Sequence, residues 1–366
     1  MRRLIPLLLL VAPALLAAEP RVAIVAYHQV ESVPQLGWSV SIENFTDQMR
    51  YLSAAGYHVI PIADAYEYLS GKRDSLPANP VVLTVDDGFE DAYTKIAPVL
   101  AQSRFPWSLY VYPHFISRGS DALKWKQVQQ LSASGVDIQG HTMTHPHLMH
   151  RSHPEMSDAD YAAWLHAELV DSKAAIEQKT GKPVRFLAYP YGDYDKAVEA
   201  EAARDGYVVG LLSEAGMNTR STNLLELKRF PMMSDTTLAQ FAKGVGAVLL
   251  DIRDVTPANE SVATPRTISA VIAQQAELVP ASVHIALLGE NGTGKYDAAT
   301  GRVTLTVAKF RRPRQQVVIY GVRTSDHAPV AAAWTFYTSA AAKARYDTIA
   351  QRLRELPLHH TQTKRQ

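Results

Sequence analysis

The chain has 366 residues, of which 47% are hydrophobic and 20% are charged, as in a globular protein with a sizeable core. Its 37 Lys and Arg residues nearly balance its 36 Asp and Glu residues, so the charge favours neither a nucleic-acid partner nor an anionic membrane surface. There is no cysteine, which excludes disulfides, a thiolate nucleophile and a lipid-anchoring cysteine.

The first segment, residues 1–18, has the pattern of a secretory signal peptide. Two arginines form a basic start, an apolar run of about 13 residues follows, and Ala18 ends the segment among small residues. The apolar run is too short to span a bilayer comfortably. We therefore expect cleavage near Ala18, export to the periplasm or the extracellular space, and no transmembrane segment after cleavage. An uncleaved anchor is the alternative.

Residues 19–246 alternate short apolar runs with helical stretches and are predicted to form one domain. The runs "RVAIVAYH" and "PVVLTVDD" are nearly continuous and rich in β-branched residues, as strands buried on both faces should be. Between the runs, apolar residues recur at three- and four-residue steps, and several of these stretches stop at glycine. This alternation predicts an α/β domain with a parallel sheet, whose functional residues gather at strand ends.

The pattern changes after residue 246. The stretch "DVTPANESVATPRT", residues 254–267, is rich in Pro and Thr, and residues 247–262 are predicted to be a linker. Residues 263–339 contain short alternating runs about ten residues apart, which predicts a small all-β sandwich. Residues 340–366 are predicted to be a short helix followed by a disordered tail.

A glycine-rich stretch, "GENGTGK" at residues 289–295, is the one candidate for a nucleotide site. A phosphate-binding loop needs Ser or Thr after the lysine and then a helix. Here Tyr296 follows, and the next residues resemble a turn and a strand. We therefore interpret the stretch as a hairpin loop and expect no nucleotide ligand.

Chemistry-bearing residues lie at the predicted strand ends. Asp86 and Asp87 close one apolar run, and His141 and His145, four residues apart on one side of a helical turn, follow another. Two imidazoles and a carboxylate form a facial ligand set that leaves metal positions open. An Asp-Asp pair alone is usually a turn, and an isolated His pair is usually solvated. Their combination at the ends of strands in one sheet favours a metal site.

Three motifs, "TVDDGFEDAY", "GHTMTH" and "FLAYPYGDYD", resemble in order and spacing those of the polysaccharide deacetylases, the NodB-homology enzymes of carbohydrate esterase family 4. "VAYHQV" and "LKRFPMMSDTTLAQF" look closest to the branch that deacetylates poly-β-1,6-N-acetylglucosamine. The resemblance covers roughly residues 21–245. It implies a distorted (β/α)7-type barrel and metal-dependent removal of N-acetyl groups from an N-acetylated glycan. The region after this barrel loosely resembles bacterial immunoglobulin-like modules.

The resemblance also implies residue roles. Asp87, His141 and His145 would bind one divalent metal; zinc fits this set best, and iron, cobalt or nickel would also fit. Asp86 would be the general base that takes a proton from the attacking water. The loop of Tyr189, Pro190 and Tyr191 would supply a backbone N–H, that of Tyr191, to the oxyanion. Apart from the resemblance, Trp125, Tyr112 and Tyr191 are candidates for an aromatic floor beneath a sugar ring, with simple packing as the alternative for each.

Two departures from the family pattern bear on the mechanism. Ala188 stands where the family has an arginine that orients the base, and Arg229 on the following strand is the candidate replacement. The late Leu-x-His motif that supplies the general acid is missing from its expected place, and His28 at the end of the first strand is the best substitute. The alternatives are that Arg229 only flanks a strand or lies at the surface, and that His28 only shapes the pocket.

Three functional hypotheses remain open at the level of sequence. The first is an N-deacetylase of an N-acetylglucosamine-containing polysaccharide. The second keeps the chemistry but changes the substrate to peptidoglycan or another acylated compound. The third is a catalytically weak glycan-binding protein. The presence of Asp86 argues against the third, because a protein that only binds needs no base.

Overall fold

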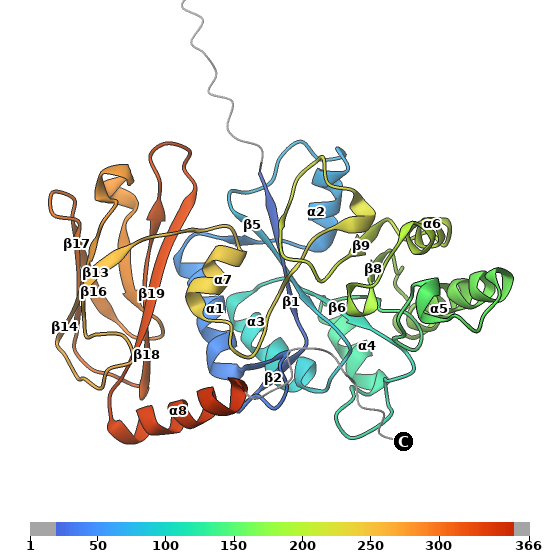
Figure 1. The fold of residues 1–366 in the computed structure, drawn as a ribbon, viewed down its shortest axis with the longest axis horizontal. Helices are drawn as coiled ribbons and strands as arrows, with labels where there is room; N and C mark the ends of the chain where they lie inside the picture. Colours follow the sequence, from blue (N-terminus) through green and yellow to red (C-terminus); the bar gives the residue numbers. More distant parts are fainter. Residues whose placement is uncertain (1–19, 355–366) are drawn as a thin grey trace, which may run out of the picture.

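The computed structural model describes residues 20–354 and shows three connected parts (Figure 1). A curled sheet surrounded by helices forms the larger part, two smaller sheets lie beside it, and a helix follows at the end of the described chain. The predicted signal peptide and the predicted tail beyond residue 354 lie outside the described residues.

The larger sheet is mainly parallel. Its strand order is β10-β1-β5-β6-β7-β8-β9, as the alternation of strands and helices predicted. Strands β1 and β5 are buried along all six of their residues, which explains their unbroken apolar sequence. The parallel strands are β1 (Val22–Tyr27), β5 (Pro80–Val85), β6 (Ser108–Val111), β7 (Asp137–Gly140), β8 (Phe186–Ala188) and β9 (Val209–Leu211).

The sheet curls, and one segment joins its two edges. Leu227 pairs with Leu211 at the end of β9, and β11 (Phe230–Pro231) pairs in parallel with β1. Strand β10 (Met217–Asn218) also pairs with β1, at its start and in the antiparallel sense. The curled half-barrel therefore brings the segment between Leu227 and β11 against the first strand, with Arg229 fully buried. Short strands β2 (Gln29–Glu31), β3 (Ser39–Ser41) and β4 (His58–Val59) lie at the periphery.

Helices surround this sheet, and local signals set their ends. Helix α5 begins at Ser157, whose side chain accepts a hydrogen bond from the N–H of Asp160, and it ends at Gly181 in a left-handed conformation. That glycine is one of the predicted stop signals. The helices are α1 (Ile42–Ala54), α2 (Ile62–Leu69), α3 (Ala97–Ser103), α4 (Trp125–Ala133), α5 (Asp158–Thr180), α6 (Lys196–Arg204) and α7 (Leu238–Gly244).

Two four-stranded sheets form the smaller part, which we call the β-module, residues 248–337. Side chains of both sheets share one apolar core that includes Ile268, Leu305, Ile319 and Phe336. One sheet contains β12 (Val248–Leu249), β19 (Pro329–Tyr337), β18 (Arg314–Val322) and β15 (His284–Leu287), and the other β13 (Ile252–Thr256), β14 (Thr267–Ile272), β17 (Arg302–Val307) and β16 (Gly292–Asp297). Helix α8 (Ala340–Arg354) follows the module.

The structure corrects the predicted linker at residues 247–262. Strand β12 pairs with β19 and β13 pairs with β14, so this segment contributes to both sheets. The Pro and Thr content suggested an unstructured bridge, but Ile252 and Val255 pack against the core of the β-module. Backbone pairing and these apolar contacts outweigh the low strand propensity of the surrounding residues.

The β-module packs against the curled sheet domain through a shared apolar core. Leu288, Val318 and Ala331 of the module belong to the same apolar core as Phe241 and Val245 of the α7 region. Figure 1 shows α7 and α1 on the side of the domain that faces β19 and β18. The two parts therefore share a core rather than hang from a flexible connection.

Candidate active site

Three predicted ligand atoms converge at one edge of the sheet. Asp87 follows β5, while His141 and His145 follow β7. The Nε2 atoms of His141 and His145 lie 3.5 and 3.4 Å from the Oδ1 atom of Asp87, and 3.1 Å from each other. Both Asp87 and His145 have positive φ angles, 73° and 62°, so the backbone turns sharply at these two ligands.

These residues fit a divalent metal ion. Ligand atoms held ~2.0–2.1 Å from a tetrahedral ion are ~3.3–3.4 Å apart, close to the three separations observed here. The Nδ1 atom of His141 lies 2.6 Å from the backbone oxygen of Ala188, to which it donates. That hydrogen bond fixes the tautomer and leaves Nε2 free to coordinate, as is usual for a metal-binding histidine.

A buried glutamate that the sequence did not single out holds the loop between the two histidines. Glu168 of α5 accepts hydrogen bonds from the N–H groups of Met143 and Thr144, at 3.0 and 2.9 Å, and from the Thr144 hydroxyl at 2.7 Å. Three donors on one carboxylate fix the backbone that carries His145. The only signal in the sequence is an acidic residue on the buried face of a helix, which is too general to identify it.

Arg229 forms a two-pronged ion pair with Asp86. Its Nη1 and Nη2 atoms each lie 2.8 Å from a different oxygen of the Asp86 carboxylate, and its Nε donates to the backbone oxygen of Leu212 at 2.8 Å. Both side chains of the pair are 1% exposed. The structure thus places Arg229 where it can orient Asp86, the position left open by Ala188.

The pKa values of the two aspartates favour their ionised forms. Burial alone would raise the pKa of Asp86, but the charges of Arg229 and His141 lower it below its usual value. Burial would also raise the pKa of Asp87, and the hydrogen bond from His141 and the charge of His145 outweigh it. The same partnership raises the pKa of His141 despite its burial.

His28 lies at the end of β1 beside the same carboxylate. Its Nε2 atom is 4.0 Å from the Oδ2 atom of Asp86, and its side chain is 10% exposed. Burial lowers the pKa of His28, and the nearby charges of Asp87 and Asp86 oppose that effect only in part. The structure therefore brings His28, Asp86 and Arg229 together around one buried charge.

The Tyr191 loop lies against His145, the second predicted histidine ligand. Tyr191 has a φ of 59°, and its ring meets His145 edge-on at 4.7 Å and stacks on His147 at 4.2 Å. The Nδ1 atom of His147 lies 2.5 Å from the Oδ2 atom of Asp193, which links the loop to the metal motif. Burial, and then the charge of Asp87, raises the pKa of the Tyr191 phenol.

Pro190, Tyr189 and Trp125 are the other residues that were predicted to lie near the oxyanion or the substrate. Pro190 is buried within the turn at Pro190–Gly192. The hydroxyl of the buried Tyr189 donates to the backbone oxygen of Leu225 at 3.1 Å, which directs this side chain into the protein beside β9. Trp125 begins α4, where the ammonium of Lys179 lies 5.9 Å from its ring centre.

Tyr112, at the end of β6, is the aromatic residue that accompanies the two histidines. Its ring centre lies 5.0 Å from that of His145 and 6.5 Å from that of His141. It stacks on Phe115 at 5.2 Å. An aromatic wall therefore borders the ligand set on the side of β6.

A second group of potential ligands ties α5 to α6. The Nδ1 atom of His166 lies 2.8 Å from Asp205 and 3.3 Å from Glu201. The His166 side chain is 53% exposed, and Arg204 pairs with Glu201. This geometry is that of a surface ion-pair network between two helices, which needs no metal.

Comparison with known proteins connects this geometry with one family. Residues 73–210 match the family model described as polysaccharide deacetylase. A putative polysaccharide deacetylase of Bacillus subtilis is 24% identical over 229 residues, which cover 62% of this chain and 77% of that protein. The poly-β-1,6-N-acetyl-D-glucosamine N-deacetylase of Escherichia coli is 22% identical over 256 residues, 60% of this chain but 38% of that enzyme.

A solved structure shows the same fold. The deacetylase of Streptococcus pyogenes, crystallised in complex with acetate, superposes with a TM-score of 0.54 at 24% identity. The match covers 62% of this chain and 99% of that chain. Within residues 20–354, no helix is both long enough and apolar enough to cross a membrane. The curled sheet, the matched residues and the related sequences agree: the chain contains a domain of the polysaccharide deacetylase (NodB-homology) family, which comprises hydrolytic N-deacetylases acting on carbon–nitrogen bonds.

Proposed function

We propose that this chain is an exported, metal-dependent N-deacetylase of an N-acetylglucosamine-containing polysaccharide. The observation that carries the proposal is the pairing of a buried base with a ligand set. Asp86 is held by Arg229 directly beside Asp87, whose oxygen faces the two histidines. A protein that only binds glycans has no need to keep an ionised carboxylate buried and oriented in this way.

Asp87, His141 and His145 would hold the metal. A divalent ion bound there, zinc by its preference for such ligands and with iron, cobalt or nickel as alternatives, would polarise the acetamide carbonyl and acidify water. The protein contributes the fixed tautomer of His141 and the anchored loop of His145. These contacts preserve the geometry of the ligands between turnovers.

Asp86 acts as the general base in this proposal. Its lowered pKa keeps the carboxylate ionised, and the two-pronged contact with Arg229 holds both oxygens in one orientation. It accepts the proton of the attacking water as the new carbon–oxygen bond forms. General-base catalysis of this kind is typically worth 10²–10⁴-fold in rate, roughly the contribution expected here.

His28 and Tyr191 serve the later part of the reaction. The Tyr191 backbone N–H donates to the oxyanion, a contribution of about 2.7–4 kcal/mol in comparable sites. The carbon–nitrogen bond then breaks, and His28, 4.0 Å from Asp86, protonates the departing amine. Its position beside the base lets the proton taken from water pass to the leaving nitrogen. The products are acetate and a glucosamine unit.

The substrate and the location follow from other features. The related E. coli enzyme is named for poly-β-1,6-N-acetyl-D-glucosamine, and we infer a substrate of this class. Residues 1–18 direct the chain to the periplasm or beyond. We further infer that residues 19–246 form a distorted (β/α)7 barrel closed by the segment 227–231, and that residues 263–339 belong to an immunoglobulin-like sandwich.

Acetate release by metal-reconstituted protein tests the proposal. The protein is incubated with poly-β-1,6-N-acetylglucosamine, chitooligosaccharides and peptidoglycan, and free acetate is measured. We expect release from the first substrate, and release slowed by roughly 10²–10⁴-fold in Asp86→Asn at the same metal content. Absence of release from every N-acetylglucosamine glycan, with one metal bound per chain, would refute it.

A further inference from the structure

A cavity of about 930 Å³ lies where the curled sheet domain, the β-module and α8 meet. Its volume is in the range of sites that enclose small ligands, and domain junctions are frequent positions for such sites. We call it the junction cavity. Its walls come from the loop after β2, the starts of α1 and α7, strands β18 and β19, and α8; they include Ser32, Glu43, Asp235, Glu260, Tyr337 and Tyr346.

Part of the wall of the junction cavity lies at the same end of the sheet as the proposed active site. Its walls include Ser32, in the loop after β2, and the first residues of α7, the helix that follows β11. Asp86 and His28 lie at this same end, after β5 and β1. Only three residues lie between His28 and Ser32, so their Cα atoms are at most about 14 Å apart. A polymer in the active site therefore needs to extend only a short way to reach the cavity.

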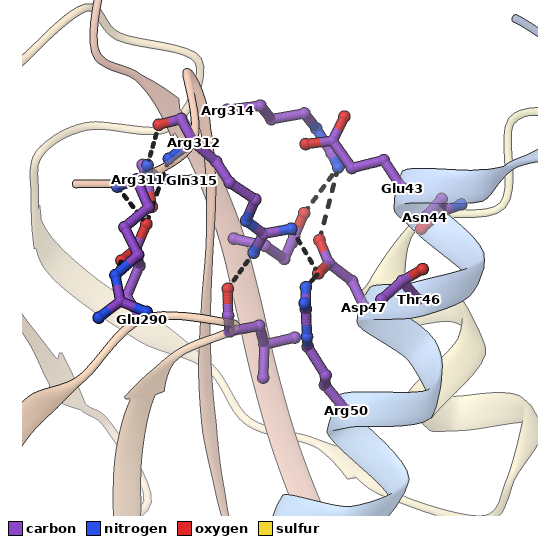
Figure 2. A network of polar contacts seen from close by, with 12 residues as sticks. Glu43, Asn44, Thr46, Asp47, Arg50, Glu290, Arg311, Arg312, Arg314 and Gln315 are labelled. Atoms are coloured by element: carbon purple, nitrogen blue, oxygen red, sulfur yellow. Dashed lines mark hydrogen bonds and ion pairs between the residues drawn. The ribbon is translucent and has the colours of Figure 1, made fainter. Parts of the chain in front are cut away.

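A polar network centred on Asp47 joins α1 to the β-module next to the cavity, as Figure 2 shows. Asp47 of α1 is 1% exposed, and its Oδ1 atom lies 2.8 Å from Arg312 of the module and 3.2 Å from Arg50. Its Oδ2 atom lies 3.8 Å from Arg314. The buried carboxylate thus has arginine partners in both parts of the molecule, and together with the shared apolar core these contacts join the two parts beside the cavity without a ligand.

The lining of the cavity suits a sugar chain. The rings of Tyr337 and Tyr346 lie 5.4 Å apart, and their hydroxyls donate to Glu260 and Glu43 respectively. Aromatic faces pack against the C–H faces of a pyranose, and the neighbouring carboxylates accept hydrogen bonds from its hydroxyls. Charges of both signs line the cavity, which disfavours a strongly anionic ligand; they are Glu43, Asp235, Glu260, Asp347, Arg314, Lys343 and Arg345.

We propose that the junction cavity is a distal subsite, which binds sugar units of the same polysaccharide chain whose N-acetyl group is held beside Asp86. The proposal rests on the proposed function and adds to it a preference for polymers over short substrates. Binding energy from the distal units would lower KM and would help to hold the reacting unit in place.

A pair of matched variants tests the subsite by rate ratios. Ser32 is an exposed residue in the wall of the cavity, whereas the exposed Ser221 lies beyond β10, near the opposite end of β1. For each metal-loaded variant, kcat/KM is measured on long polymer and on N-acetylglucosamine oligomers of two or three units. Ser32→Trp should lower the polymer-to-oligomer ratio at least tenfold, while Ser221→Trp should leave the ratio at the wild-type value.

A second pair tests the aromatic wall from the other side of the cavity. Tyr346→Ala should lower the same ratio, mainly through a higher KM for polymer, and Tyr346→Phe should restore most of it because the ring remains. Unchanged ratios in both Ser32→Trp and Tyr346→Ala would overturn the subsite. Wild-type protein that releases acetate from neither substrate would instead overturn the proposed function, so the two failures are distinguishable.

Discussion

At the scale of single residues, Asp86 and Asp87 are adjacent in sequence but have different partners. The carboxylate of Asp86 faces Arg229, whereas that of Asp87 faces His141 and His145. Asp87→Asn should therefore weaken metal binding more than tenfold, because even the loss of an outer-shell partner of a ligand costs about 10–100-fold in affinity. Asp86→Asn should keep the metal and lower kcat by roughly 10²–10⁴-fold.

Two measurements on the same samples distinguish these outcomes. Elemental analysis gives the metal content, and an acetate-release assay gives the activity. His166→Ala provides a control, because His166 belongs to the ion-pair network between α5 and α6. Loss of metal from Asp86→Asn together with an active Asp87→Asn enzyme would reverse the assigned roles.

The ion pair of Arg229 predicts a particular kinetic pattern. Lysine at this position keeps the positive charge but cannot make the two-pronged contact with Asp86. Arg229→Lys should therefore lower kcat by roughly tenfold or more with little change in KM, because it disturbs the base rather than the glycan site. Arg229→Ala should also lower the free energy of unfolding by about 3–5 kcal/mol, since it leaves a buried carboxylate unpaired. Equal kcat values for Arg229→Lys and wild type would contradict an orienting role.

At the scale of elements, Asp91 connects β2 to the segment after β5 and predicts a pH dependence of stability. It accepts a hydrogen bond from the N–H of Val30, and burial raises its pKa to about 7. The folded protein thus retains a proton that the unfolded chain, with a pKa of about 3.9, has released. The stabilising contribution is complete below about pH 4 and is lost as the pH rises towards 7.

Asp91→Asn removes this titration and keeps an oxygen for the N–H of Val30. At pH 8 the free energy of unfolding of the variant should exceed that of wild type by up to about 4 kcal/mol. At pH 5 the difference should be smaller. Urea denaturation at both pH values measures the effect. A difference between the two proteins that is the same at pH 5 and pH 8 would show that Asp91 does not titrate in this range.

At the scale of the whole molecule, the β-module supports the catalytic domain. Phe241 and Val245 share an apolar core with Leu288 and Val318 of the module, and Asp47 pairs with Arg312. A chain ending at residue 246 should therefore show a lower melting temperature or fail to remain soluble. Asp47→Asn in the full chain should lower the free energy of unfolding by about 3 kcal/mol, because it leaves the arginines facing one another. Identical melting temperatures for the shortened and full chains would show that the domains fold independently.

The sequence by itself determined the chemistry of the proposed site, because the informative patterns are local. Asp86 and Asp87 follow one continuous apolar run, and His141 and His145 stand four residues apart after another. In a parallel sheet, such strand ends lie at one edge whatever the details of packing, which is why these side chains were predicted to meet. The strand–helix alternation, which predicted the parallel sheet, is a local pattern of the same kind.

Only the tertiary structure decided which distant residues support that site. Arg229 meets Asp86 across 143 residues of sequence, and Glu168 meets Thr144 across 24. No spacing rule selects such partners, because the curl of the sheet and the packing of α5 bring them together. The same limit explains why Tyr189 points into the protein and why the expected linker forms strands. The same limit applies to the contact between the two parts of the molecule, where Asp47 and Arg312 meet across 265 residues of sequence.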